Sequence, residues 1–339
     1  MIDLSPSSEE LAFADAVVAV LNDLAPLESL ATDASSGPAD LGALWNTWAD
    51  LGWLRSGVAE DAGGLGATLV EEVLVYREFG RHLMSTSLLA TGIAAQIAGE
   101  AGKPGRSEQF MNGSAYAAFG LPLGGEAPDR RAPSEILLID AMPGADVLLL
   151  NGDSAILIDG TELPSGRRRG IDARAFLTQT RVTPAVPAVE SQSAFLLRRA
   201  RTLLSAQLCA AAEESLRLAV DYAKMREQFG RPIGAFQSIA HQCADMAGRA
   251  RIAWAQTRFA CLAVMDDRAD ADLQLESALL VASSAADQNT ATAVRVHGGL
   301  GFTTGCAVHH YLKRAILLRE LAGSTRRIEA KLLTEGPAL

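Results

Sequence analysis

The sequence has few cysteines, and their positions exclude most cysteine chemistry. Only four occur among 339 residues, at Cys209, Cys243, Cys261 and Cys306, and no two have the C-x-x-C spacing of a redox motif or a zinc site. Three of the four lie in apolar patterns typical of helices. We therefore expect reduced, buried thiols and a cytoplasmic protein.

Histidine is almost as scarce, and its spacing argues against a metal centre. The five histidines are His82, His241, His297, His309 and His310. His309 and His310 are adjacent, so on a helix they point to different sides, and the other three have no spacing suited to a shared metal ion. We expect no metal site.

Long apolar runs and an excess of basic residues are also absent. No segment approaches the roughly 18 consecutive apolar residues of a membrane-spanning helix. The start of the chain predicts an amphipathic helix capped by Ser7 or Ser8 rather than a signal peptide. The formal net charge of -10 disfavours nucleic acid or an anionic membrane as a partner. We expect a soluble intracellular protein that meets any anionic ligand through local groups.

Helical periodicity, by contrast, covers most of the chain. Apolar residues recur every three or four positions from about residue 8 to 101, and again from about 195 nearly to the end. In between, short runs such as SEILLIDA and ADVLLLNG alternate with Gly, Pro, Asn and Asp, which is typical of a small antiparallel sheet. The order predicts an α+β protein, mostly α, with domains at 1–108, 109–194 and 195–339.

The segment DYAKMREQFGRPIGAFQSIAHQCADM, residues 221–246, predicts a helical corner. One helix is expected to end at Phe229-Gly230, because Pro232 prevents its continuation, and a second helix is expected to begin near Ala235.

Polar side chains and one aromatic ring gather around this corner: Arg226, Gln228, Gln237 and Phe229. The guanidinium and amides suit a phosphate or a ribose, and the phenyl ring suits a flat ring of a ligand. The alternative is a structural αα-hairpin whose polar residues are merely solvated.

A glycine-rich turn follows in AVRVHGGLGFTTGCAVHHYLKRA, residues 293–315. Gly298, Gly299 and Gly301 end a helix and expose backbone N–H groups, which permits the close approach of a phosphate. The alternative is a plain helix C-cap.

Together these two stretches resemble the acyl-CoA dehydrogenase family of flavoproteins. The matching residues are Tyr222, Arg226, Gln228, Phe229, Gly230, Pro232, Ile233, Gln237, Ala244, Asp245, Met246, Val296, His297, Gly298, Gly299, Gly301, Phe302, Tyr311, Leu312, Lys313 and Arg314. The segments GWLRSGVAEDAGGLGAT and EEVLVYREFGR are similar to that family's first domain, so the resemblance extends over nearly the whole chain. It implies an N-terminal helical domain, a middle β-domain and a C-terminal four-helix bundle.

In that family the C-terminal bundle of one subunit clasps the adenine and pyrophosphate end of an FAD held mainly by a neighbouring subunit. The resemblance assigns this clasp to Arg226, Gln228, Phe229, Gln237, Arg295, Gly298 and Gly299. The family usually has Gln at the position of Arg295, and a guanidinium there also suits a pyrophosphate.

The resemblance also shows where a catalytic residue is missing. The family's reaction removes an α-proton of a CoA thioester with a carboxylate while a β-hydride passes to the flavin, so it needs a general base near the α-carbon. By position, the usual base falls on Ala322 and the base of some members on Ala200, one residue before Arg201. Glu320 lies two residues from the first position, about 200° around a helix. We expect no catalytic residue in this chain.

The middle domain departs from the family in a matching way. The Thr-Glu-Pro and Gly-Ser-Asp stretch that holds the flavin ring and the thioester has no counterpart between Phe110 and Phe195, and the domain is shorter than usual. The arginines of SGRRRG, residues 165–170, are a candidate for a CoA phosphate, and a solvated loop is the alternative.

This pattern resembles the non-catalytic half of heteromeric (α2β2) bacterial acyl-CoA dehydrogenases, which have one flavin site per pair of related chains. The resemblance implies FAD as the cofactor and a related full-length acyl-CoA dehydrogenase subunit as the partner. It implies a CoA thioester from steroid degradation, including cholesterol catabolism, as the substrate, and an electron-transfer partner such as an electron-transfer flavoprotein. Two alternatives stay open: a self-sufficient homo-oligomer with a displaced base such as Glu320 or Glu190, and a flavin-free scaffold of the same fold.

Overall fold

The computed structural model describes most of the chain. The described residues are 7–27, 41–123, 133–152, 154–161, 163, 167–172, 175–191, 193–303 and 305–335. The chain divides into two compact units. The helical unit consists of Met1–Ser35, Val73–Met84 and Arg201–Leu339, and the sheet unit consists of Ser36–Glu72 and Ser85–Ala200.

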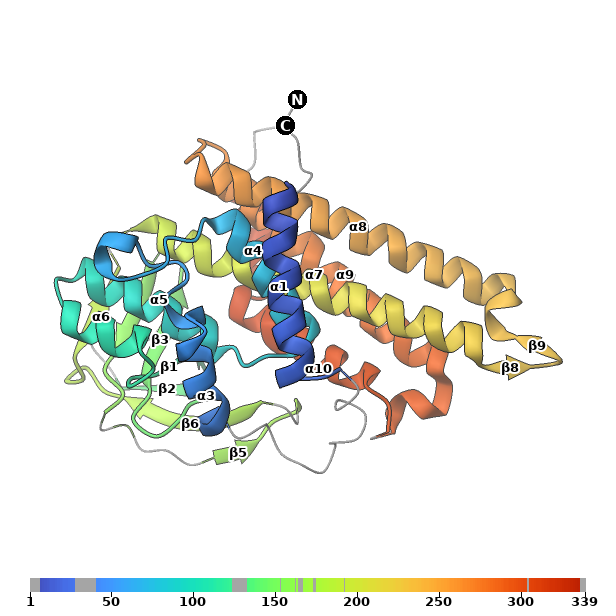
Figure 1. The fold of residues 1–339 in the computed structure, drawn as a ribbon, viewed down its shortest axis with the longest axis horizontal. Helices are drawn as coiled ribbons and strands as arrows, with labels where there is room; N and C mark the ends of the chain where they lie inside the picture. The colour runs from blue at the N-terminus through green and yellow to red at the C-terminus, as the bar shows by residue number, and fades with distance from the viewer. Residues whose placement is uncertain are drawn as a thin grey trace. The chain divides into compact units, whose positions relative to one another are not determined.

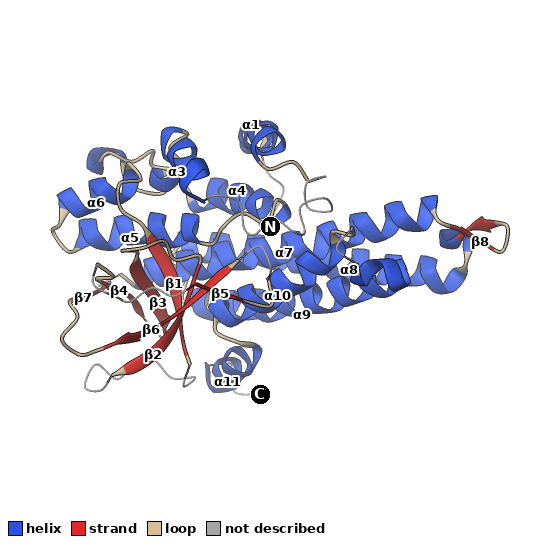
Figure 2. Ribbon diagram, turned by 90° about the horizontal axis from the view of Figure 1, so that it is seen from below, coloured by secondary structure: helices blue, strands red, loops and turns tan. Residues whose placement is uncertain are grey.

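Long helices make up the helical unit. They are α1 (Ser8–Leu24), most of α4 (Leu69–Arg81) and of α7 (Ala194–Met225), α8 (Gln237–Met265), α9 (Ala271–His297), α10 (Val308–Ala322) and α11 (Thr325–Glu335). Within this unit, α7, α8 and α9 run alongside one another for most of their length (Figures 1 and 2). Helices α8, α9 and α10 end where the sequence places Asp or Gly residues, which disfavour the continuation of a helix.

A buried asparagine holds three of these helices in register. The Nδ2 of Asn289 on α9 donates to the carbonyl oxygens of Ala212 on α7 and Met246 on α8, at 3.1 and 2.9 Å. Its Oδ1 accepts from Nε of Arg249 at 2.9 Å. Because the side chain is fully buried and fully bonded, it fixes the register of the bundle as well as stabilising it.

The first helix begins as the sequence predicts. Ser7 is the N-cap of α1, and it forms a capping box in which the Ser7 hydroxyl accepts from Glu10 N at 3.2 Å while the Glu10 carboxylate accepts from Ser7 N at 2.8 Å.

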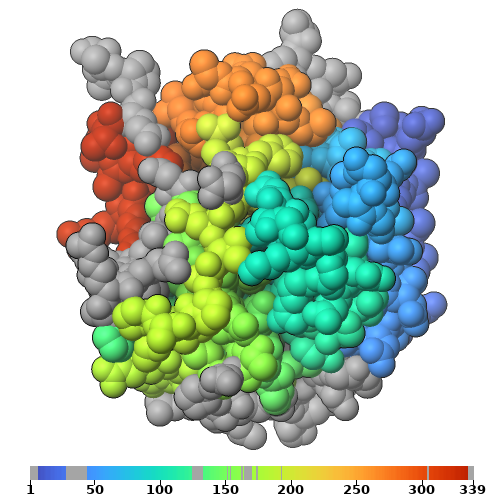
Figure 3. All heavy atoms as spheres, turned by 90° about the vertical axis from the view of Figure 1, so that its left-hand side faces the viewer, coloured from blue at the N-terminus to red at the C-terminus, as the bar shows by residue number. Residues whose placement is uncertain are grey.

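Short helices and a sheet make up the sheet unit. The helical elements are α3 (Leu41–Asp50), η1 (Trp53–Arg55), η2 (Glu60–Ala62), α5 (Ser87–Glu100) and α6 (Pro104–Met111). Figure 3 shows α5 and α6 in teal beside the blue segment that contains α3 and η1. Helix α5 is apolar on all sides and almost completely buried, which is typical of a central helix.

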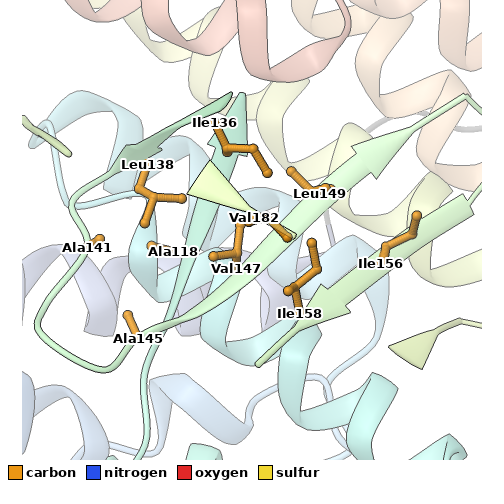
Figure 4. Packing of buried hydrophobic residues seen from close by; sticks show 10 residues of the cluster. All are labelled: Ala118, Ile136, Leu138, Ala141, Ala145, Val147, Leu149, Ile156, Ile158 and Val182. Carbon is orange, nitrogen blue, oxygen red and sulfur yellow. The ribbon is translucent and has the colours of Figure 1, made fainter. Parts of the chain in front are cut away.

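Seven strands form one sheet in this unit. They are β1 (Ala117–Pro122), β2 (Ser134–Ile139), β3 (Asp146–Asn151), β4 (Ser154–Ile158), β5 (Arg167–Arg169), β6 (Phe176–Val182) and β7 (Ala188–Glu190), in the order β5-β6-β2-β1-β3-β4-β7. Apolar side chains from β1, β2, β3, β4 and β6 point toward one another and form its core (Figure 4). Helix α5 lies against β1, where the Thr91 hydroxyl bonds both the N–H and the carbonyl of Ala117.

The structure corrects two expectations about this sheet. It is mixed rather than antiparallel, because β1 and β3 pair in parallel, with Phe119 opposite Leu148. Strand β2 pairs antiparallel with the other edge of β1, so the chain has already reversed once when it returns as β3. The arginines of SGRRRG form strand β5 at an edge of the sheet, not a loop, because Arg167–Arg169 pair with β6.

Helices, a sheet and again helices follow one another along the chain, which confirms the predicted mostly helical α+β fold. Among the residues that the structure describes, no helix is long and apolar enough to cross a membrane.

Candidate functional site

A β-hairpin, not a helical corner, carries the first group of predicted site residues. Helix α7 ends at Met225, and β8 (Glu227–Gln228) pairs antiparallel with β9 (Arg231–Pro232) before η3 (Ile233–Ala235) and α8 follow. The prediction that a helix ends at Phe229-Gly230 is therefore wrong by four residues. Figures 1 and 2 show the hairpin projecting beyond the ends of α7 and α8.

The turn of this hairpin explains the difference. Phe229 and Gly230 have positive φ angles, 54° and 77°, and form the two central residues between Gln228 and Arg231. Two successive positive φ angles define a type I′ turn, the connection that best matches the twist of a two-residue hairpin. A left-handed conformation costs a bulky L-residue roughly 1 kcal/mol or more. Such strain at an exposed residue is typical of functional sites.

The hairpin presents its side chains to solvent. Phe229 is 93% exposed, and its ring lies edge-on to Phe236 with centroids 6.2 Å apart. Arg226, Gln228 and Gln237 are exposed as well. The phenyl ring of Phe229 and the guanidinium of Arg226 are thus both open to a ligand from solvent.

Phe229→Gly should leave the unfolding free energy unchanged or raise it by up to about 1 kcal/mol, because the glycine removes the left-handed strain and little buried area is lost. The measurement is equilibrium denaturation of the purified chain. Phe119→Gly, at a fully buried phenylalanine of β1, is the matched control and should cost at least about 3 kcal/mol. A loss of similar size in both variants would contradict the strain argument.

The second group of predicted residues lies where α9 ends. Gly298 has φ 60° and ψ -139°, and η4 (Gly298–Phe302) continues from it. Arg295, Gly298 and Gly299 are exposed, and a Cβ on either of these two glycines would meet only open space. The backbone is thus accessible to a phosphate. Nη2 of Arg295 donates to the Thr292 hydroxyl at 2.8 Å.

One hydrophobic cluster brings the two groups to the same end of the helical unit. It contains Ala219 and Ala223 of α7, Met246 of α8, Ala293, Val294 and Val296 of α9, and Cys306 and Val308 beyond η4, with Tyr222, Ile233 and Ile239 packed against it. The hairpin and the glycine turn therefore share a core, although some 70 residues separate them in the sequence.

His297 lies in this shared core and was missed as a functional candidate. Its ring stacks on Tyr222 with centroids 4.4 Å apart and an interplanar angle of 19°, and its Nδ1 is 2.8 Å from the carbonyl oxygen of Ala293. The Nδ1–H tautomer donates this bond. Burial lowers the pKa of His297, so the ring is neutral near pH 7. Two signals in the sequence could have drawn attention to it, the adjacent glycines and its place among the residues that match the family.

A neutral, buried histidine makes stability depend on pH in a defined direction. In the unfolded chain His297 takes up a proton near its ordinary pKa of about 6.5, whereas in the folded chain it does so only at lower pH. Stability should therefore fall as the pH drops from about 6.5 to the lowered pKa. In His297→Phe that component should vanish from the pH profile of unfolding. An NMR titration giving His297 a pKa above about 6.5 would contradict the assignment.

The turn expected to carry a base in the family has no carboxylate. Helix α10 ends at Ala322, and α11 begins at Thr325. Gly323 and Ser324 between them have φ angles of 121° and 58°. Ala322 is 1% exposed. Ala200, the other base position, is fully buried in α7.

A buried ionic cluster holds this turn instead. Nε of Arg201 donates to the carbonyl oxygen of Ala322 at 3.1 Å, and its Nη1 and Nη2 donate to the two carboxylate oxygens of Glu276 at 2.5 and 2.7 Å. Nζ of Lys331 lies 3.3 Å from the same carboxylate. Glu276 is 1% exposed and engaged by two cations, so it is a poor general base despite its place in the helical unit.

The two carboxylates that the sequence suggests as alternative general bases are exposed. Glu320 has a side chain 45% exposed, and it pairs with Arg319 at 3.3 Å. Glu190 is an exposed residue of β7. Neither carboxylate is therefore enclosed in a buried site.

Glu72 in the sheet unit has a perturbed pKa but a structural role. Burial raises the pKa of its carboxyl, although Nε of Arg199 donates to it at 2.7 Å and the Ser56 hydroxyl at 2.8 Å. Gly57 leaves the space that the pair fills, since a Cβ there would collide with Arg199. Both carboxylate oxygens are bonded, so Glu72 anchors the loop before α4.

Within the part of the chain that the structure describes, no group of three or more His, Cys, Asp or Glu side chains could hold a metal ion. The neighbouring rings of His309 and His310 are tilted against each other, with centroids 4.1 Å apart. The four cysteines are free, and three of them are buried while Cys243 is half-buried.

Comparisons with known proteins match both helical parts of the chain to one family. Residues 7–113 match the model of the N-terminal domain of acyl-CoA dehydrogenases, and residues 191–332 match the model of their C-terminal domain. The acyl-CoA dehydrogenase IpdE2 of Mycobacterium tuberculosis is 31% identical over 287 residues, covering 82% of this chain and 81% of that protein. FadE34 of the same organism is also 31% identical, over 79% of this chain but only 38% of its own length.

Solved structures share the fold. A chain of the Tcur3481-Tcur3483 steroid ACAD superposes with a TM-score of 0.80 at 24% identity, over 96% of this chain and 97% of that chain. A chain of the ChsE4-ChsE5 complex from M. tuberculosis gives 0.81 at 21% identity, over 99% of this chain and 100% of that chain.

Proposed function

Because the chain belongs to the acyl-CoA dehydrogenase family, we propose that it is a non-catalytic subunit that clasps an FAD held mainly by a related, catalytic partner chain. The observation that carries the proposal is a contrast within the chain. The hairpin and the glycine turn are built and exposed at one end of the helical unit, while both base positions are alanines, Ala322 and Ala200. A subunit that serves a partner's flavin needs the first feature and not a base of its own.

In this proposal each clasp residue has a simple role. Arg226 and Arg295 meet the pyrophosphate charge, the backbone N–H groups at Gly298 and Gly299 approach the phosphate oxygens, and Phe229 stacks on the adenine. Gln228 and Gln237 supply polar contacts to the ribose and adenine. When bound, FAD accepts the hydride that leaves the β-carbon of the thioester. In the proposal, the clasp residues of this chain bind and orient FAD, and none of them takes up or gives up a proton in the reaction.

The relatives support a two-chain assembly. One similar structure is, by its name, a complex of ChsE4 with ChsE5. The name of the other, Tcur3481-Tcur3483, also joins two protein names. FadE34 has more than half of its length outside the match to this chain, which is room for a second unit of similar size in one polypeptide.

The names of these similar proteins also bear on the class of substrate. We propose a CoA thioester formed during steroid side-chain or ring breakdown, with an electron-transfer flavoprotein as the acceptor. The word steroid in the name of one structural neighbour supports the first part.

Flavin content tests the proposal directly. The chain is purified alone and after co-expression with the acyl-CoA dehydrogenases of its own genome that keep a carboxylate at the base position, and the absorption spectrum is recorded. The proposal expects a colourless single chain and a yellow complex of two chains. A yellow single chain that oxidises a CoA thioester would show a self-sufficient homo-oligomer, and complexes without flavin would show a scaffold.

Restoring a carboxylate with Ala322→Glu should not create activity in the single chain, because the flavin-ring stretch is also missing from the sequence. The variant should also be less stable, since the new carboxylate enters a buried position whose neighbouring cation, Arg201, already binds Glu276. Turnover is measured by dye reduction with added FAD. Activity in this variant would show that the middle domain holds a flavin ring by itself.

A further inference from the structure

Two stacked rings join the halves of the clasp. Tyr222 lies in the last turn of α7, and His297 is the last residue of α9, with centroids 4.4 Å apart and planes 19° from parallel. Neither residue belongs to the clasp itself. Aromatic pairs of this geometry contribute more than their buried area alone.

Tyr222 lies at the base of the hairpin. Its carbonyl oxygen accepts from the N–H of Arg226 at 2.8 Å, and the carbonyl oxygen of Arg226 accepts from the N–H of Ile233 at 2.8 Å. Ile233 in turn packs against the shared cluster. The backbone at Tyr222 is therefore hydrogen-bonded into the base of the hairpin.

His297 lies at the base of the glycine turn. It directly precedes Gly298, and Gly301 approaches so closely that an added Cβ would lie 3.2 Å from the Cβ of His297 and 2.7 Å from the carbonyl oxygen of Val294. The turn η4 thus folds back onto the last turn of α9, against the backbone of Val294 and the Cβ of His297.

The chemistry of the His297 ring suits a link between the hairpin and the glycine turn. The bond to Ala293 satisfies Nδ1 and fixes the ring plane, and the neutral ring enters the apolar cluster without the cost of a buried charge.

We propose that Tyr222 and His297 are positioning residues that hold the hairpin and the glycine turn together as one surface for the adenine and pyrophosphate end of FAD. The ligand in this statement rests on the proposed function, whereas the coupling of the two segments is a property of the chain alone.

Hydrogen exchange of the purified chain tests the coupling. His297→Leu introduces an apolar side chain of similar size and removes the stacked ring, whereas His297→Phe keeps a ring on Tyr222; both variants lose the bond from Nδ1 to Ala293. In His297→Leu, the amides of residues 227–231 and 233 should exchange about fivefold faster than in the wild type, although they lie far away in sequence. His297→Phe should stay close to the wild type.

Val308→Ala is the matched control, because Val308 is a fully buried member of the same cluster and belongs neither to the ring pair nor to the hairpin. It should lower the unfolding midpoint without selectively accelerating the hairpin. The proposal is overturned if His297→Leu leaves the hairpin unchanged, or if His297→Phe or Val308→Ala accelerates it as much.

The flavin-loaded complex supplies the second measurement. There His297→Leu should weaken FAD retention about fivefold and His297→Phe should preserve it. If the wild-type complex holds no flavin, the proposed function fails while the exchange result still decides the coupling. If flavin is held and retained equally by His297→Leu and the wild type, the positioning role alone is wrong.

Discussion

Glu276→Gln should destabilise the chain by about 3–5 kcal/mol, a large loss for a substitution that barely changes the size of the side chain. The change removes the charge that compensates Arg201 and Lys331, and Arg201 is only 9% exposed. A buried guanidinium cannot regain its partner from solvent, so most of its desolvation cost is left uncompensated. Denaturant unfolding of the purified chain, followed by circular dichroism, measures the effect.

Glu320→Gln is the matched control for this prediction. It is the same substitution at a carboxylate that also pairs with an arginine, but on the surface, and it should cost less than about 1 kcal/mol. The double variant Arg201→Met with Glu276→Gln should lose less than the sum of its single changes, because the unpaired charge is gone. A small loss for Glu276→Gln alone would show that solvent reaches the cluster.

Arg226→Ala combined with Phe229→Ala should weaken FAD binding by the two-chain complex about 100-fold or more. A charged hydrogen bond to a pyrophosphate contributes about 1.5–3 kcal/mol and stacking on a base about 1–3 kcal/mol, and about 1.4 kcal/mol corresponds to a factor of ten. FAD release is followed by fluorescence after dilution of the complex.

A matched pair elsewhere separates this loss from a general effect. Arg181→Ala with Phe13→Ala removes the same residue types from exposed positions outside the clasp, with Arg181 63% and Phe13 42% exposed, and should leave FAD retention unchanged. Unchanged flavin stoichiometry in the Arg226 and Phe229 variant would mean that the assignment of the hairpin is wrong, whatever the outcome for stability.

Much of the fold could be predicted from local patterns in the sequence. The N-cap at Ser7 and the strand-rich middle segment both depend on neighbours in the sequence, and each lies where the periodicity and the turn residues predict. The parallel pairing of β1 with β3 was not accessible, because it depends on which edge of β1 the strand β2 occupies.

The candidate site was also beyond prediction from local patterns, and to a greater degree than the fold. The hairpin was predicted as a helix end because its strands have two residues each, too few for a period, and because a phenylalanine rarely takes a positive φ angle. The cluster of Arg201, Glu276 and Lys331 joins three helices that are distant in sequence, and each member fits an ordinary helical pattern. Only packing in three dimensions reveals it.

The way Arg201 holds the turn after α10 bears on how such a chain can evolve. The arginine binds a main-chain oxygen of residue 322, which every amino acid provides. The shape of the turn is thus independent of the side chain at that position, and replacing a buried carboxylate by alanine removes a desolvation cost. In the proposed two-chain enzyme, where the partner would supply the base, an alanine at position 322 would therefore carry no penalty in folding.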